Sequence, residues 1–167
     1  MSGRLRRTLA AHLGSSRVSR VVYGAIIGLA LLVVLELHPP AAGAVVGTLL
    51  ATAFAVALAE LYSELIGART QAGLGMHAEG LGAIAGDAAA VAFGICFPAI
   101  FFVLAAFDAM DLDTAFTVAK WTGLGLIAFY GFAAARLGGA KLPRALIEAL
   151  AVGAIGALLI AIKALIH

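Results

Sequence analysis

The sequence predicts an all-α integral membrane protein that crosses the bilayer five times. Of its 167 residues, 63% are hydrophobic and only 12% are charged, which is about half the charged fraction of a soluble domain. Five apolar stretches follow one another, and each is long enough to cross a hydrocarbon core of about 30 Å as a helix. Behind a basic tail of residues 1–20, we expect a single transmembrane domain (residues 21–167) with helices at residues 21–37, 41–66, 81–107, 114–137 and 145–166.

The first predicted helix follows a tail that contains five arginines and no acid. This pattern is typical of a cytoplasmic segment, and the apolar run is long for a signal peptide, so we interpret it as an uncleaved span. Gly24 and Gly28 stand four residues apart on it, a spacing that permits a close helix contact. The helix ends before Pro39 and Pro40, which cannot continue it.

The second and third predicted helices carry acids close to the link between them. Glu60 and Glu64 stand four residues apart near the end of the second helix and therefore share one face. Asp87 lies about six residues, or roughly 9 Å, into the third helix. Pro98 lies near the middle of that helix, where we expect a kink or a freed carbonyl.

The last two predicted helices are joined by a basic link, residues 136–144. An acidic loop with Asp108, Asp111 and Asp113 precedes the fourth helix. Together with Glu36, these aspartates predict an acidic surface at that end of the bundle. Glu148 lies in the first turn of the fifth helix, where the helix dipole favours an acid.

The distribution of cationic residues orients the helices. If the N-terminus is cytoplasmic, nine Lys and Arg residues fall on the cytoplasmic side and only Lys120 and Lys163 fall outside. Because cytoplasmic segments are enriched in Lys and Arg, we expect a cytoplasmic N-terminus and an external C-terminus. Four acids from three helices then share one shallow cytoplasmic layer: Glu60, Glu64, Asp87 and Glu148.

This acidic layer has two interpretations. Carboxylate oxygens suit hard or borderline divalent cations, and closely spaced carboxylates can hold a proton for exchange. Alternatively, the acids reach water or pair with arginines of the cytoplasmic links, Arg69, Arg136 and Arg144. Because deep intramembrane acids are usually functional, we favour a transport site at Glu60 and Asp87. For Glu64 and Glu148 we favour the structural interpretation.

No other group of residues points to a chemical activity. The four histidines lie in links or tails without helical pairing, so we predict neither haem nor zinc ligation. The single cysteine, Cys96, is expected to pack within an apolar helix. We find no nucleotide-binding loop, hydrolase triad or nucleic-acid-binding patch, so we predict neither an enzyme nor a nucleic-acid partner.

Four motifs occur in a fixed order along residues 20–166. They are Tyr-Gly-x-x-x-Gly ending at Gly28, Ala-Glu-Leu-Tyr-Ser beginning at Ala59, Ala-Phe-Gly followed by Pro98, and two arginines flanking a glycine link before a glycine-spaced last helix. In this order the motifs resemble the vacuolar iron transporter family. The resemblance implies a five-helix homodimer that exports ferrous iron or manganese from the cytosol in exchange for protons.

The chain departs from this family at two places. The family's helix-one aspartate falls on Ile27. Glu36 cannot replace it, because nine residues further on it lies about 180° around the helix and some 13 Å away. The family's long metal-binding domain between helices two and three is here a short link. Of the family's metal ligands, only the glutamate matched by Glu60 is present.

The sequence thus predicts an iron-transporter-like protein of a bacterial inner membrane, with Gly24 and Gly28 near the two-fold axis of a homodimer. Its predicted function is proton-coupled export of a divalent cation of the Fe²⁺/Mn²⁺ class through Glu60, Asp87 and Glu64. The metal would be a substrate, with no permanently bound cofactor. The alternative is a non-transporting scaffold or accessory subunit. Convergence of the acids on a water-accessible cavity favours transport, whereas acids buried against arginines favour the scaffold.

Overall fold

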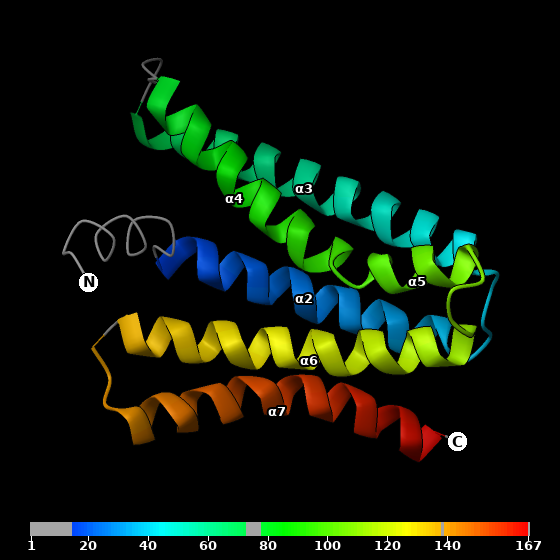
Figure 1. Cartoon of the computed structure of the whole chain (residues 1–167). Coiled ribbons are helices and arrows are strands. Elements are labelled where there is room, and N and C mark those ends of the chain that lie inside the picture. Colours follow the sequence, from blue (N-terminus) through cyan, green and yellow to red (C-terminus); the bar gives the residue numbers. More distant parts are fainter. Residues whose placement is uncertain (1–14, 73–77, 138, 167) are drawn as a thin grey trace.

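The computed structural model describes residues 15–72, 78–137 and 139–166, and every regular element in this part of the chain is a helix. The helices keep their Figure 1 labels: α2 (Ser15–Leu35), α3 (Ala42–Ala72), α4 (Ala78–Cys96), α5 (Ala99–Ala106), α6 (Leu112–Leu137) and α7 (Leu142–Ile166). The all-α prediction is therefore confirmed for the described residues.

The helices form an antiparallel arrangement around α2 (Figure 1). On one side α2 packs against α4, and on the other it packs against α6. Helix α7 lies along α6, while α3 packs on α4 and α5. The far ends of α3 and α4 extend away from the other helices (upper left in Figure 1), so little direct contact is left between α2 and α3.

Several of these helices are long and apolar enough to span a membrane. Three qualify singly: Arg17–Leu35, Ala42–Gly67 and Leu112–Arg136. The bent pair Gly80–Cys96 and Ala99–Ala106 qualifies together as a fourth. The chain therefore has the features of a multi-pass membrane protein. Some side chains of α7 lie outside the described residues, and the fifth span and the sidedness of the helices stay predictions.

The third predicted helix is broken at the proline. Helix α4 ends at Cys96, α5 begins at Ala99, and their axes differ by 47°. The Phe97 N–H still donates to the Phe93 carbonyl at 2.9 Å, but Pro98 has no N–H to continue the ladder. The expected kink at Pro98 is confirmed, and it divides the predicted third helix (residues 81–107) into α4 and α5.

The first helix begins earlier than the sequence predicted. Helix α2 starts at Ser15, so Arg17 and Arg20 are helical residues and not part of a tail that ends at residue 20. The predicted boundary was placed at the first apolar residue. A helix can nevertheless include Arg residues before that point, because their long side chains reach polar partners. The tail up to residue 14 lies outside the described residues.

Glycines allow α2 and α4 to cross in close contact. A methyl group added at Gly24 would overlap the backbone carbonyl of Val91, and one at Gly28 would lie 3.1 Å from the carbonyl oxygen of Ile95. From the opposite side, a methyl at Gly94 would overlap the backbone of α2 around Val21 and Ala25. Gly24 and Gly28 therefore contact α4 of the same chain. The homodimer, and the place of these glycines near its two-fold axis, stay predictions.

The main core lies where α5 and α6 begin. Fully buried residues from five helices meet there, among them Leu32, Leu49, Ile95, Phe102 and Phe116. The rings of Phe102 and Phe116 pack edge to face, with centroids 4.8 Å apart, the geometry that aromatic pairs prefer. By contrast, α3 exposes large apolar side chains on its outer face, as expected for a surface that contacts lipid.

Candidate functional site

The first ion-pair group joins α2 to α3. The Arg20 guanidinium pairs with the Glu60 carboxylate, and its Nη2 also donates to Oε1 of Glu64. The two acids are one turn apart on α3, so a single planar guanidinium can reach both. The Glu60 side chain is 16% exposed and that of Glu64 40%. Glu60 is therefore the more deeply placed partner.

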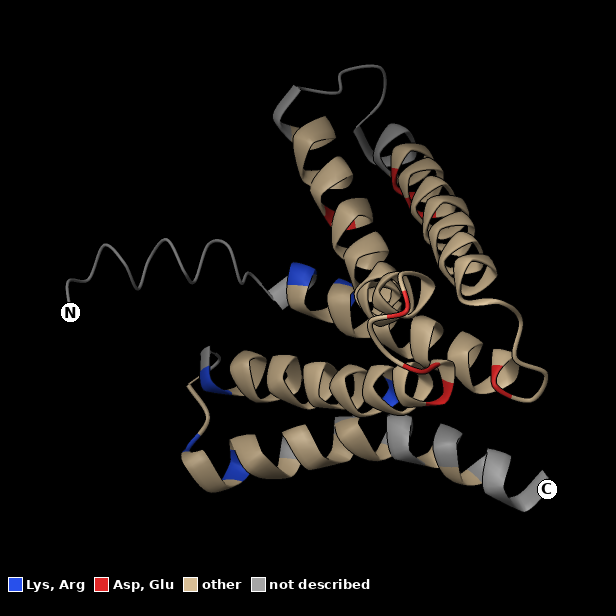
Figure 2. Cartoon of the chain, turned by 45° about the vertical axis from the view of Figure 1, so that its right-hand side comes forward, with Lys and Arg blue, Asp and Glu red and all other residues tan. Residues whose placement is uncertain are grey.

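A second pair joins α2 to α4. The Nε atom of Arg17 lies 4.0 Å from Oδ1 of Asp87. The Arg17 guanidinium passes directly over Gly86, where an added methyl would lie 3.0 Å from Nη2. Because Arg17 and Arg20 are three residues apart, they leave neighbouring positions on one side of α2. We call Arg17, Arg20, Glu60, Glu64 and Asp87 the inner ion-pair group; its acids lie on the α3 and α4 ribbons in Figure 2.

The charges of α2 have the wrong sign for its own dipole. A helix N-terminus favours anions and a C-terminus favours cations, yet α2 has Arg17 and Arg20 near its start and Glu36 just past its end. These charges therefore gain nothing from the helix that carries them. Their stabilisation comes from partners on other helices.

The opposite end of α2 has such a partner on α6. The Nζ atom of Lys120 lies 2.7 Å from both carboxylate oxygens of Glu36. The side chains are 15% and 19% exposed, respectively. At 1.5 Å per residue, Arg20 and Glu36 are about 24 Å apart along the helix, so the two ion pairs lie about as far apart as the two borders of a hydrocarbon core.

The predicted transport residues are thus held by arginines of α2. Glu60 pairs with Arg20, and Asp87 faces a different arginine, Arg17. Among the described residues, no group of three or more His, Cys, Asp or Glu side chains is placed to hold a metal ion. The side chains of Glu148 and Arg69, which the sequence placed in the same layer, lie outside the described part.

The acids also do not line either of two hollows in the described part of the chain. One hollow is an apolar groove between α6 and α7. Another lies near Ala42, Asp108 and Asp111, close to the α5–α6 turn. Neither is lined by Glu60, Glu64 or Asp87. The side chains of the inner ion-pair group instead contact one another through ion pairs.

Comparison with protein-family models, with curated proteins and with solved structures finds no match. The functional argument therefore rests on the chain's own geometry. Ile27, at the position of the aspartate in the resembled family, packs against the main hydrophobic core. The neighbours of Ile27 in the core are apolar, so this position suits an apolar side chain better than a charged one.

Proposed function

We propose that this chain is a non-transporting membrane module, a scaffold or accessory subunit, in which the intramembrane acids tie helices together. The observation that carries the proposal is that Glu60 and Asp87, the two acids predicted to form a transport site, both face arginines of α2. A carboxylate that neutralises a guanidinium offers less charge to a passing cation. Breaking such a pair to admit a metal would also leave an unpaired cation.

The ion pairs have a clear structural role in this arrangement. Helices α3 and α4 extend away from the remaining helices at this end (Figure 1), and direct packing between α2 and α3 is slight. Arg20 bridges this gap to α3, and Arg17 reaches α4. Because transmembrane helices have no strong hydrophobic drive to associate, polar contacts of this kind contribute to their arrangement.

A second candidate function, ion-coupled transport, has one observation in its favour. The span formed by α4 and α5 is interrupted at Pro98 and bent by 47°. Discontinuous helices of this kind bind substrates and coupling ions in many transporters. The substrate would be a divalent cation that displaces Arg20 and Arg17 from Glu60, Glu64 and Asp87.

Flux measurements separate the two functions. Purified chain is reconstituted into vesicles, and Mn²⁺ and Fe²⁺ movement is measured under a pH gradient for wild type, Glu60→Gln and Asp87→Asn. We expect wild-type vesicles to match protein-free vesicles, and both variants to unfold at lower SDS fractions than wild type. If wild type carries metal, and both variants lose the flux while they remain folded, the module proposal is wrong and transport is correct.

A further inference from the structure

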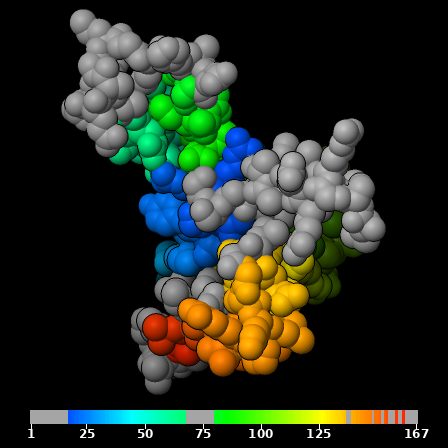
Figure 3. Space-filling view, turned by 90° about the vertical axis from the view of Figure 1, so that its left-hand side faces the viewer, coloured from blue at the N-terminus to red at the C-terminus, as the bar shows by residue number. Residues whose placement is uncertain are grey.

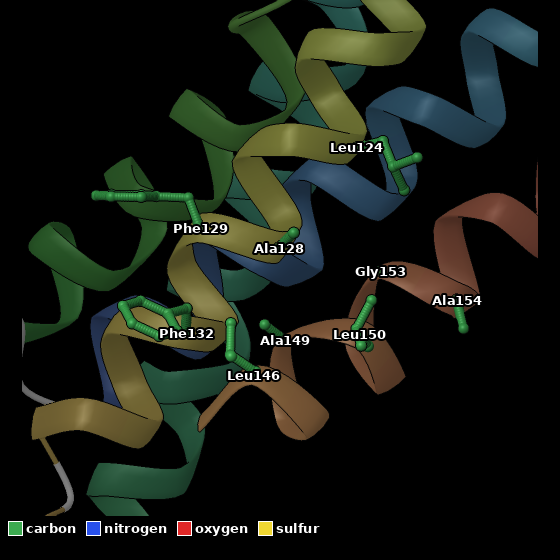
Figure 4. Close-up of a pocket in the computed structure, with 9 residues that line it drawn as sticks. All are labelled: Leu124, Ala128, Phe129, Phe132, Leu146, Ala149, Leu150, Gly153 and Ala154. Atoms are coloured by element: carbon green, nitrogen blue, oxygen red, sulfur yellow. The ribbon is translucent and has the colours of Figure 1, made fainter. Parts of the chain in front are cut away.

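An apolar groove runs between α6 and α7. Its volume is about 690 Å³, which is within the usual range of ligand sites. Figure 4 shows its wall, made by two helices and free of polar side chains. The lining includes Leu124, Phe129 and Phe132 on α6, and Leu146, Leu150 and Ala154 on α7.

A basic turn lies directly at one end of this groove. Arg136, Lys141 and Arg144 are exposed where α6 passes into α7, and Figure 2 shows their blue segments gathered at this end. The start of α7 is uncovered in the space-filling view (orange in Figure 3). The Arg136 Nη1 atom donates to the Ala140 carbonyl at 3.0 Å, which leaves most of its five N–H donors for other acceptors.

The local charge is strongly positive. Between residues 136 and 148, the sequence has one acid, Glu148, against three cations: Arg136, Lys141 and Arg144. The side chain of Glu148 lies outside the described part, and Arg144 has an interaction of its own. Among the described residues, no acidic side chain forms an ion pair with Arg136 or Lys141. These two cations therefore carry the electrostatic argument.

The basic turn directly adjoins the lining of the groove. Phe132 lies one helical turn, about 6 Å, before Arg136, and Leu146 follows Arg144 by two residues. A molecule with an anionic head at the turn could therefore extend an apolar tail along the groove. This combination of charge and apolar shape matches an amphiphile of the membrane itself, because basic clusters at transmembrane helix ends bind anionic lipid headgroups.

We propose that the α6–α7 groove holds one acyl chain of an anionic phospholipid, with the phosphate of the lipid bound by Arg136 and Lys141. Bulk lipid tails are as apolar as the groove wall, so the groove supplies shape and the cations supply selectivity. A cation near an anionic lipid favours its binding by roughly fivefold. The site is independent of whether the chain is a scaffold or a transporter.

Lipid competition tests this site. The full chain is exchanged into micelles with equal phosphatidylglycerol and phosphatidylcholine, and retained lipids are counted by native mass spectrometry. We expect wild type to retain phosphatidylglycerol preferentially. Arg136→Gln and Lys141→Gln should each reduce the preference roughly fivefold, whereas Arg136→Lys should preserve it. Free glycerol phosphate should not compete, because it lacks the tail that fills the groove.

A second pair of variants tests the groove separately from the charges. Ala154→Phe fills the groove and should lower the retention of both lipids, while Ala51→Phe adds the same ring to an exposed position of α3 and should have no effect. Equal retention of the two lipids by wild type would overturn the proposal. So would an unchanged preference in the Arg136→Gln/Lys141→Gln double variant, or equal effects of the two phenylalanine variants.

Discussion

Lys120 places its ammonium nitrogen 2.7 Å from each carboxylate oxygen of Glu36, and this pair fastens the end of α2 to α6. The two residues are 84 positions apart in the sequence. Both side chains are less than one-fifth exposed. A mostly buried charge is costly unless a close partner neutralises it. The pair therefore favours the one arrangement of α2 and α6 in which both charges are paired.

Removing one member of this pair should be worse than removing both. We expect Lys120→Met to lower the free energy of unfolding by about 2 kcal/mol, between the values for exposed and fully buried pairs, since it leaves Glu36 unpaired. The Lys120→Met/Glu36→Gln double variant should recover most of the loss. Equilibrium unfolding in mixed SDS micelles measures both. A double variant that is as unstable as the sum of the two singles would contradict this prediction.

Alanine substitutions at Gly24 and Gly47 compare a glycine at a helix crossing with one that faces open space. A methyl at Gly24 meets the backbone of Val91, whereas one at Gly47 meets no other atom within 4 Å. We expect Gly24→Ala to destabilise the chain by about 1–3 kcal/mol, as overpacking does. Gly47→Ala should be neutral or slightly stabilising, because alanine is the better helix former. The same SDS titration gives the comparison, and equal effects of the two substitutions would show that α2 and α4 do not cross here.

The two glutamates paired with Arg20 should contribute unequally. Glu60 is 16% exposed and Glu64 is 40% exposed. Solvent screening limits an exposed pair to about 1 kcal/mol or less, so we expect Glu64→Gln to change stability little and Glu60→Gln to change it more. A double-mutant cycle between Arg20→Gln and each glutamate variant measures the two coupling energies. A larger coupling for Glu64 would reverse the assignment.

The helices and the break at Pro98 were predictable because they depend on local properties. Apolar run length defines a span, and a proline cannot donate the hydrogen bond that continues a helix. The glycine pair on α2 also indicated close contact correctly, but the sequence could not identify the partner. Any helix with a matching small-residue surface satisfies the same spacing, and here Gly94 provides that surface on α4.

The ion pairs were not predictable, because their partners are distant in sequence. The lengths of the side chains alone allowed Glu60 and Asp87 to pair with any arginine at that end of the helices. The assignment to Arg20 and Arg17 requires these residues to be part of α2. A helix boundary based on hydropathy excluded them because they are charged. One signal was available: Arg17 and Arg20 have helical spacing, which is compatible with a shared face.

Two helix ends with the same hydrogen-bond pattern give the last prediction. After α5, the Ala109 N–H donates to the Leu104 carbonyl at 2.9 Å, and Asp108 has a φ of 57°. After α6, the Ala140 N–H donates to the Ala135 carbonyl at 3.0 Å, and Gly139 has a φ of 84°. Both are left-handed helix caps, for which glycine is the best residue.

Exchanging the residues at these caps should therefore have opposite effects. Asp108→Gly should raise the free energy of unfolding by up to about 1 kcal/mol, because it removes the steric cost of the side chain at positive φ. Gly139→Ala should lower it by about 1 kcal/mol, because it introduces that cost. Asp108→Ala is the control, since it removes the charge but keeps a Cβ atom. If Asp108→Ala were as stabilising as Asp108→Gly, the gain would come from relieving repulsion with the neighbouring aspartates and not from the backbone.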